Sequence, residues 1–313
     1  ADAALPECCS SGLPAVTAGY RAWRIHPMVV RDVLNEASLD FAAAGIPSPR
    51  LDAEVLLSFC LQCDRLEFFK NPLMPIGEEA LAAFHKAAAR RRHWEPVAYI
   101  TGRKEFWSFT VEVNKHVLIP RPETEVLVEE TLDLCRQQAA AAIRILDIGT
   151  GSGAIALALA RELPQARIVA TDISAAALAI AEKNALNLAL NSQINFRQGN
   201  LFAPVDDFFD IIVSNPPYIA EAEYQALPPG VRNYEPVEAL WAGARGTDFY
   251  QKIIHEAPVH LKAGGWLLLE IGATQSGQVM DIAAASGKYD DIAVRNDYAG
   301  LPRVIKARRR ISG

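Results

Sequence analysis

The stretch LDIGTGSGAIALALA, residues Leu146 to Ala160, joins the end of an apolar run to three closely spaced glycines and a second apolar run. It predicts a buried strand, a tight turn at Gly149, Gly151 and Gly153, and a helix over 154–163. In open α/β folds, ligands bind at such a turn, at the carboxyl edge of a parallel sheet. We therefore expect an α/β fold with a nucleotide-like ligand at this turn.

The chain beyond Ala142 alternates apolar strands with helices, which is typical of a parallel sheet covered on both faces. Its tail predicts a final hairpin, with strands at 289–297 and 303–310 separated by a Gly-Pro turn. We predict a doubly wound sheet with an antiparallel edge hairpin. The expected strands are IRILDI (143–148), ARIVAT (166–171), INFRQ (194–198), FFDIIV (208–213) and WLLLEI (266–271), and the expected helices cover 154–163, 174–189 and 248–260.

The residues before the sheet predict a small helical domain, because apolar side chains recur at helical spacing from Met28 onward. Helices are expected from Met28 to the GIPSP stretch, around 53–60, and from about Glu78. The stretch EFWSFTVEV then alternates like an exposed hairpin, and a helix is expected over 125–136. We expect a disordered extension at 1–27, a helical substrate-recognition domain at 28–100, a hairpin and linker at 101–120, and the sheet domain at 121–313.

The net charge, the apolar runs and the cysteines of the chain argue against several classes of protein. A net charge of −6 and a pI near 5.6 argue against a protein that mainly coats nucleic acid. No apolar run is long enough to span a bilayer. Five cysteines, an odd number, favour a reducing compartment, and Cys60 and Cys63 fit buried thiols on a helix better than metal ligands. We expect a cytoplasmic monomer without a metal.

The glycine turn by itself leaves two cofactors open. Gly149, Gly151 and Ala154 also satisfy the looser dinucleotide fingerprint, so a nicotinamide-dependent oxidoreductase is an alternative. Asp172, at the end of the second strand, is placed to bind ribose hydroxyls in either case, or to cap the next helix together with Ser174. S-adenosylmethionine needs apolar walls for its adenine and a carboxylate for its ribose. A phosphate-binding P-loop is excluded, because no Gly-Lys-Ser/Thr follows the glycines.

The stretch SNPPYI, Ser214 to Ile219, decides between these cofactors. It follows the fourth strand of the sheet, so it is expected at the same edge as the glycine turn. Here the chain resembles class I adenosylmethionine-dependent methyltransferases that act on planar amide or amino nitrogen, which carry such a motif at this point. The Asn215 oxygen and the Pro216 carbonyl can accept the two N–H groups of an NH2, and Tyr218 can lie over its plane.

The whole region from about Met28 to the C-terminus resembles the HemK/PrmC family, the protein-(glutamine-N5) methyltransferases that modify the glutamine of the GGQ motif in class 1 peptide chain release factors. A DNA or RNA adenine-N6 methyltransferase is the alternative, although nothing after Tyr218 looks like a base-reading domain. The matching stretches are GRKEFW (102–107), IPRPETE (119–125), LDIGTGSGAIALALA (146–160), NPPYI (215–219) and YEPVEALWAG (234–243).

This resemblance implies a class I methyltransferase (Rossmann-like) sheet, S-adenosyl-L-methionine as cofactor, a class 1 release factor as partner, and neither a membrane nor a nucleic-acid target. Arg121 and Glu123 would border the substrate channel, or an ion pair there would pin the domain junction. The implied cofactor-binding residues are Gly149, Thr150, Gly151, Ser152, Gly153, Asp172, Asn215 and either Asn200 or Leu201, and the implied substrate-binding residues are Asn215, Pro216, Pro217 and Tyr218.

Overall fold

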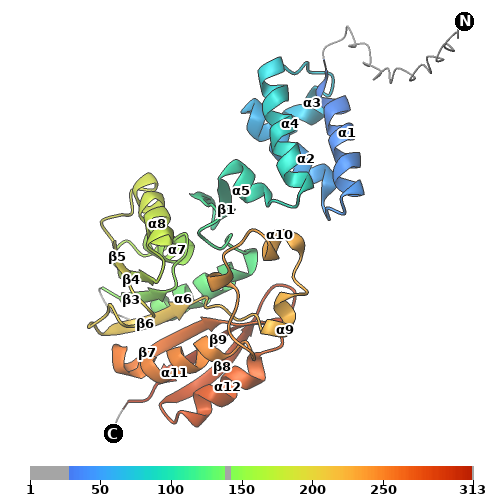
Figure 1. Cartoon of the computed structure of the whole chain (residues 1–313). Helices are drawn as coiled ribbons and strands as arrows, with labels where there is room; N and C mark the ends of the chain where they lie inside the picture. The colour runs from blue at the N-terminus through green and yellow to red at the C-terminus, as the bar shows by residue number, and fades with distance from the viewer. Residues whose placement is uncertain (1–27, 138–141, 312–313) are drawn as a thin grey trace, which may run out of the picture.

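The computed structural model describes residues 28–137 and 142–311, in which a helical N-terminal region and a hairpin precede a large sheet (Figure 1). The prediction for residues 1–27 lies outside this part. The sheet has the order β5-β4-β3-β6-β7-β9-β8. Its first five strands run parallel, and β9 and β8 are antiparallel at one edge, which confirms the predicted fold class. The strands are β3 (Arg144–Ile148), β4 (Arg167–Asp172), β5 (Ile194–Gln198), β6 (Phe209–Ser214), β7 (Leu261–Glu270), β8 (Tyr289–Asn296) and β9 (Pro302–Arg309).

Successive residues of the central strands face opposite sides of the sheet, so their apolar runs fill two separate cores. On one side, Ile145 of β3 and Val213 of β6 pack in a cluster with α6 (Glu125–Gln137), α7 (Ala154–Glu162) and α8 (Ala175–Asn187). On the other side, Leu146 and Ile212 pack in a cluster with α11 (Asp248–His260) and α12 (Ser276–Ala285). Burial on both faces explains why these strands show no alternation in the sequence.

The helical region has a hydrophobic core of its own, formed by the predicted apolar faces, and its helices lie at one end of the molecule in Figure 1. A buried ion pair joins Arg91 to Asp52 at 2.7 Å across this core. Two five-residue helices, α3 and α5, were not predicted because they are too short to show a helical period. The helices are α1 (Val30–Ala43), α2 (Pro49–Leu61), α3 (Leu66–Lys70), α4 (Glu78–Arg92) and α5 (Val97–Thr101).

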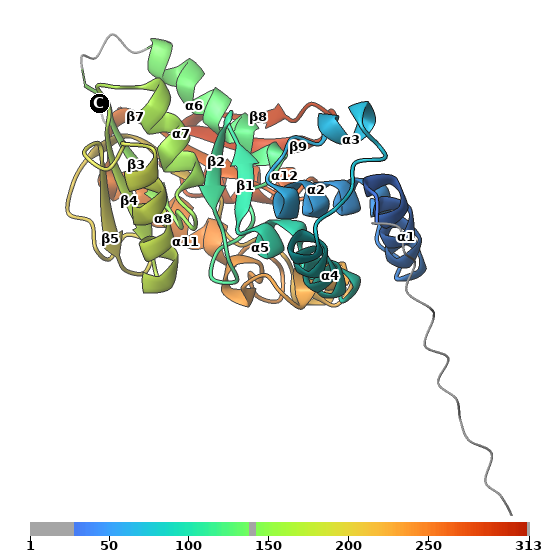
Figure 2. The ribbon, with the colours of Figure 1, turned by 90° about the horizontal axis from the view of Figure 1, so that it is seen from above.

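A β-hairpin links this region to the sheet, as Figure 2 shows from above. Its strands are β1 (Arg103–Phe106) and β2 (Phe109–Glu112), and both turn residues, Trp107 and Ser108, have positive φ, as two-residue hairpin turns require. The hairpin is bound to α8, because Asn184 accepts a hydrogen bond from the Glu112 N–H at 2.7 Å. The short helix η1 (Pro122–Thr124) then leads into α6.

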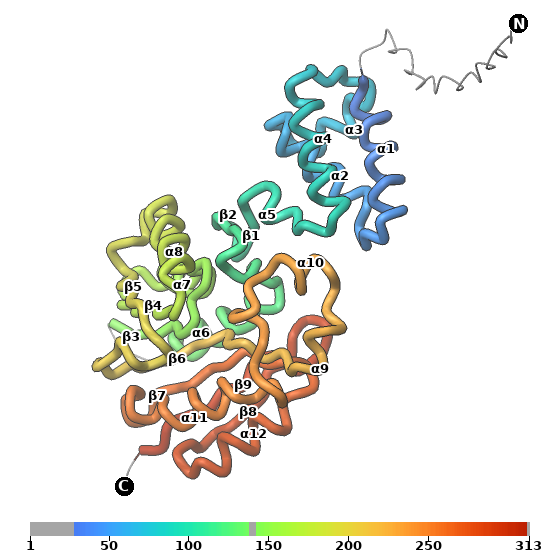
Figure 3. The backbone as a smooth tube through the Cα atoms, viewed as in Figure 1, coloured from blue at the N-terminus to red at the C-terminus, as the bar shows by residue number. Residues whose placement is uncertain are grey.

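The segment 219–247 leaves the sheet after β6 and runs to the helical region before it returns to α11 (Figure 3). It carries α9 (Glu221–Tyr224), α10 (Pro229–Arg232) and η2 (Val237–Ala239). The Tyr234 hydroxyl donates a hydrogen bond to the His93 carbonyl at 2.8 Å. The sequence predicted neither the short helices of this segment nor helix α12. Across the described ranges, no helix is both long and apolar enough to cross a membrane.

Candidate active site

A cavity of about 950 Å3 lies at the carboxyl ends of β3, β4 and β6, and it collects most of the predicted site residues. Strands β3 and β6 are neighbours, with Ile148 beside Ser214, so the glycine turn and the NPPY motif meet at one edge of the sheet. Four predicted residues are not part of the cavity lining: Gly153, Tyr218, Arg121 and Glu123. The predicted residues that line it are Gly149, Thr150, Gly151, Ser152, Asp172, Asn200, Leu201, Asn215, Pro216 and Pro217.

The glycine turn leaves open space where a ligand can approach the backbone. Gly149 and Gly151 have φ of +71° and +57°, and a Cβ atom added at either would meet no described heavy atom within 4 Å. Gly153 differs, because its Cβ would lie 3.1 Å from that of Ala181. The first two glycines therefore line the cavity, whereas Gly153 allows α7 to pack closely against α8.

The buried carboxylate of Asp147 is hydrogen-bonded to the glycine turn. The Thr150 hydroxyl donates a hydrogen bond to its Oδ2 at 2.6 Å, and its Oδ1 has no partner among the described residues. Burial raises the pKa of Asp147 to about 7, with a smaller contribution from the nearby Asp172. Its role is thus to orient the loop, as a buried side chain that does not reach the ligand cavity.

Asp172 accepts hydrogen bonds from the glycine turn and from the residue that begins α8. Its Oδ2 accepts a hydrogen bond from the Gly151 N–H and its Oδ1 one from the Ser174 N–H, both at 2.9 Å. Ser174 itself caps α8, because its hydroxyl accepts from the Ala177 N–H. Each carboxylate oxygen keeps acceptor capacity, and the residue lines the cavity. A carboxylate beside a wall without Cβ atoms fits an adenosine-containing cofactor.

Replacing Gly151 by alanine is expected to weaken binding of S-adenosylmethionine at least about tenfold, because the new methyl group would enter cavity space. The control is Gly287→Ala in the turn before β8, where φ is +65° and an added Cβ also meets no described atom within 4 Å. Both variants carry the same backbone strain, but only Gly151 lines the cavity. Calorimetric titration of the cofactor checks this, and equal affinities for the two variants would contradict it.

The NPPY motif is fixed by hydrogen bonds from three directions. The Ser214 hydroxyl donates to the Ile148 carbonyl at 2.7 Å, which ties the end of β6 to that of β3. The Asn215 Nδ2 donates to the Thr124 hydroxyl at 3.2 Å. The Tyr218 carbonyl accepts from Gln275 Nε2 at 2.9 Å, and the Tyr218 ring packs against the cluster around α11. Burial raises the pKa of Tyr218 to about 12.

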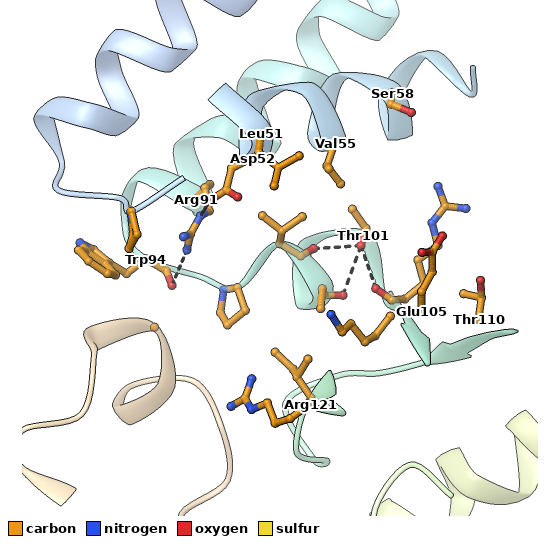
Figure 4. A pocket seen from close by; sticks show the side chains of 18 of the residues that line it. Leu51, Asp52, Val55, Ser58, Arg91, Trp94, Thr101, Glu105, Thr110 and Arg121 are labelled. Atoms are coloured by element: carbon orange, nitrogen blue, oxygen red, sulfur yellow. Dashed lines mark hydrogen bonds and ion pairs between the residues drawn. The ribbon is translucent and has the colours of Figure 1, made fainter. Parts of the chain in front are cut away.

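Arg121 forms an ion pair with Glu235, whose side chain is 1% exposed and also accepts a hydrogen bond from the Ile119 N–H. This pair joins residues 119–121 to the segment that carries α10. Ile119, Arg121 and Glu235 line a second cavity of about 1120 Å3, and Figure 4 shows Arg121 across it from Asp52. Pro120 and Pro236 line the first cavity, so the two segments form a shared wall. Glu123 is exposed and lines neither cavity.

Four polar residues beside the predicted site residues Asn215, Tyr218 and Arg121 were not predicted from the sequence: Thr124, Glu235, Glu270 and Gln275. Thr124 stands directly after the predicted Glu123, and Glu235 lies in the quoted YEPVEALWAG stretch. Glu270 ends an apolar strand just as Asp172 does, and that placement was the available signal. Gln275 follows no such pattern in the sequence.

Two family models match this chain. A family model described as the PrmC N-terminal domain matches residues 32–102, and one described as the methyltransferase small domain matches residues 124–227. The catalytic domain of hMettl16, crystallised with the MAT2A 3'UTR hairpin 6, aligns with a TM-score of 0.55 at 18% identity and covers 72% of this chain and 82% of that one. At this identity the likeness shows the fold alone.

Relatives with much higher identity cover nearly the whole chain. The release factor glutamine methyltransferase of Koribacter versatilis is 40% identical over 284 residues, which is 90% of this chain and 99% of that protein. The enzyme of the same name from Geobacter sulfurreducens is 42% identical, over 89% of this chain and 96% of its own length. The one from Coxiella burnetii is 45% identical, over 84% and 92%. The chain therefore belongs to the family of release factor glutamine methyltransferases, which use S-adenosyl-L-methionine.

Proposed function

We propose that this enzyme transfers a methyl group from S-adenosyl-L-methionine to the side-chain amide nitrogen, N5, of the glutamine in the GGQ motif of class 1 peptide chain release factors, a modification that supports translation termination. The observation that carries the proposal is the placement of Asn215. It lines the same cavity as the glycine turn and Asp172, and its Nδ2 is bound to Thr124, so its Oδ1 remains free to accept a hydrogen bond from a substrate amide.

The cofactor is assigned to the glycine side of the cavity. Gly149, Gly151 and the residues between and after them are proposed to hold its methionine part, and Asp172 its ribose. Asn200 and Leu201, which also line the cavity, are proposed to lie beside its adenine. When bound, S-adenosylmethionine supplies an electrophilic methyl group on a positively charged sulfur.

The substrate amide is proposed to lie between the cofactor and the NPPY motif. An amide nitrogen is a poor nucleophile, because its lone pair is delocalised into the carbonyl group. The Asn215 Oδ1 and the Pro216 carbonyl can accept its two N–H groups and hold the nitrogen for attack. Pro216 and Pro217 restrict the backbone of the acceptor, so little motion has to be frozen on binding. The nitrogen gains the methyl group as the methyl–sulfur bond breaks and a neutral thioether is left, and it releases one proton to solvent, so it remains an uncharged amide.

Three further assignments remain proposals. Tyr218 is proposed to lie over the plane of the amide, and Arg121 and Glu123 to border the channel for the polypeptide. The helical region, residues 28–100, is proposed to recognise the release factor, with residues 101–120 as a linker and residues 121–313 as the catalytic domain. We also propose that the enzyme acts as a monomer in the cytoplasm.

The proposal predicts that purified enzyme adds one CH2 of mass to the GGQ peptide of a class 1 release factor. A release factor with Glu in place of that Gln should remain unmodified, because a carboxylate offers no N–H to donate and no nitrogen to attack. Mass spectrometry of the treated factor and transfer of labelled methyl groups measure this. Label that arrives on adenine-containing DNA or RNA and not on the factor would replace this proposal by an adenine-N6 activity.

A further inference from the structure

Within residues 28–137 and 142–311, the carboxamide of Asn215 is hydrogen-bonded to one side chain, that of Thr124. Its Nδ2 lies 3.2 Å from the Thr124 hydroxyl oxygen, although the two residues are far apart in the sequence. Thr124 ends the short helix η1 just before α6, is 4% exposed, and contributes to the lining of the ligand cavity. This contact therefore joins the segment before α6 to the carboxyl end of β6.

The Thr124 hydroxyl has a second polar neighbour, Glu270, at the end of β7. Glu270 is 1% exposed, and its Oε2 has no hydrogen-bond partner in the described ranges. Burial raises the pKa of Glu270 to about 7, against the opposing effect of a hydrogen bond with Thr124. Above that pH the group is a carboxylate, which only accepts hydrogen bonds.

These three side chains set the direction of the hydrogen bonds between them. A hydroxyl group has a single proton, so Thr124 that donates to the Glu270 carboxylate can only accept from Asn215. The donor of an amide is its NH2, and the Asn215 NH2 must therefore face Thr124. The amide oxygen then points the other way. A half-turn about the last side-chain bond would instead set an oxygen against the hydroxyl oxygen and leave both without a proton to share.

Other interactions hold the backbone around Asn215, but they do not choose between the two orientations of its side-chain amide. The Ser214 hydroxyl holds the backbone before Asn215, and Gln275 holds the Tyr218 carbonyl after it. Pro216 and Pro217 restrict the chain between them. The backbone on both sides of Asn215 is thus held in place, whereas the side-chain amide itself is held by Thr124.

We propose that Thr124 is a positioning residue, which holds the Asn215 carboxamide with its oxygen toward the ligand cavity, and that Glu270 sets the polarity of the Thr124 hydroxyl. This inference rests on the proposed function, since a substrate NH2 needs an acceptor at this position. With the amide reversed, two NH2 groups would face each other and the nitrogen would not be held for attack.

The activity test compares Thr124→Val, which keeps the shape and removes the hydroxyl, with Thr124→Ser, which keeps the hydroxyl. At a pH about one unit above the pKa of Glu270, kcat of the valine variant is expected to fall about 10- to 100-fold, with KM for the release factor and Kd for the cofactor within about threefold. The serine variant should keep kcat within about threefold of the wild type. The control is Thr131→Val, which removes another buried hydroxyl on α6, bound to the Leu127 carbonyl, and should keep normal kcat.

Near-normal kcat in Thr124→Val would overturn the inference, and so would an equal loss of kcat in the serine variant. A second readout does not depend on the substrate: the side-chain NH2 signals of Asn215 in nitrogen-15 spectra, assigned with Asn215→Ala. We expect one proton protected from exchange in the wild type and in Thr124→Ser, and unprotected in Thr124→Val. If the wild type fails to methylate release factors, the proposed function fails while these spectra still decide the role of Thr124. If the wild type is active and the spectra of all three agree, only the inference fails.

Discussion

Replacing Asn215 by alanine is expected to lower the rate of methyl transfer to the release factor by at least about 100- to 1,000-fold. Enzymes that lose one preorganised hydrogen-bonding group typically lose activity by a similar factor. The alanine side chain removes one of the two acceptors proposed for the substrate NH2. The Pro216 carbonyl alone cannot fix the nitrogen, because the amide could rotate about the remaining hydrogen bond. Single-turnover measurement with labelled cofactor gives this rate directly.

Cofactor binding should survive this substitution, since the hydrogen bonds that Asp172 accepts from Gly151 and Ser174 do not involve the Asn215 side chain, which is bound to Thr124. Calorimetric titration of S-adenosylmethionine should give an affinity within about threefold of the wild type. The control is Asn191→Ala, an exposed asparagine in the connection between α8 and β5, which should change neither quantity. A variant at Asn215 with near-normal turnover would refute the role given to its amide.

The second large effect is expected for Asp172→Ala, which should raise the Kd of S-adenosylmethionine at least about 100-fold. A change of this size corresponds to the loss of two charge-assisted hydrogen bonds. The carboxylate supports the cofactor in two ways. It is proposed to bind the ribose directly, and it also holds the Gly151 N–H and the Ser174 N–H. Its removal therefore loosens the glycine turn and the start of α8 together. Calorimetric titration measures the change in Kd.

A loss of stability alone could also weaken binding, so a matched substitution is needed. Asp210, at the opposite end of β6 from the cavity, likewise accepts a hydrogen bond from a backbone N–H, that of Arg144, at 2.9 Å. Asp210→Ala should lower the free energy of unfolding by about 1–3 kcal/mol, comparable to the cost at Asp172, through the unsatisfied N–H group. It should bind the cofactor normally. If Asp210→Ala weakened binding as strongly as Asp172→Ala, the specific role of Asp172 would be wrong.

Much of the fold follows from local patterns. The helical spacing of Val30, Val33 and Phe41 predicted a helix whose buried face is the one observed. Strands β3, β4 and β6 were predicted from their apolar runs because both faces of the sheet are covered, which removes polar residues from the strands. Helices α3, α9 and α10 escaped prediction, since four or five residues do not complete a periodic pattern.

The sequence by itself determined the family, the succession of sheet strands with helices α6, α7, α8 and α11, and the residues at the ends of β3, β4 and β6, because each of these is written in contiguous motifs. Only the tertiary structure decided which partner each polar side chain has. Arg121 pairs with Glu235, and Asn215 is held by Thr124. These partners come from segments about 90 or more residues apart, and a hydrogen bond at such separation leaves no periodicity in the sequence. Such a hydrogen bond forms because the parallel sheet brings the carboxyl ends of its strands to one edge, where buried polar groups must form hydrogen bonds with one another.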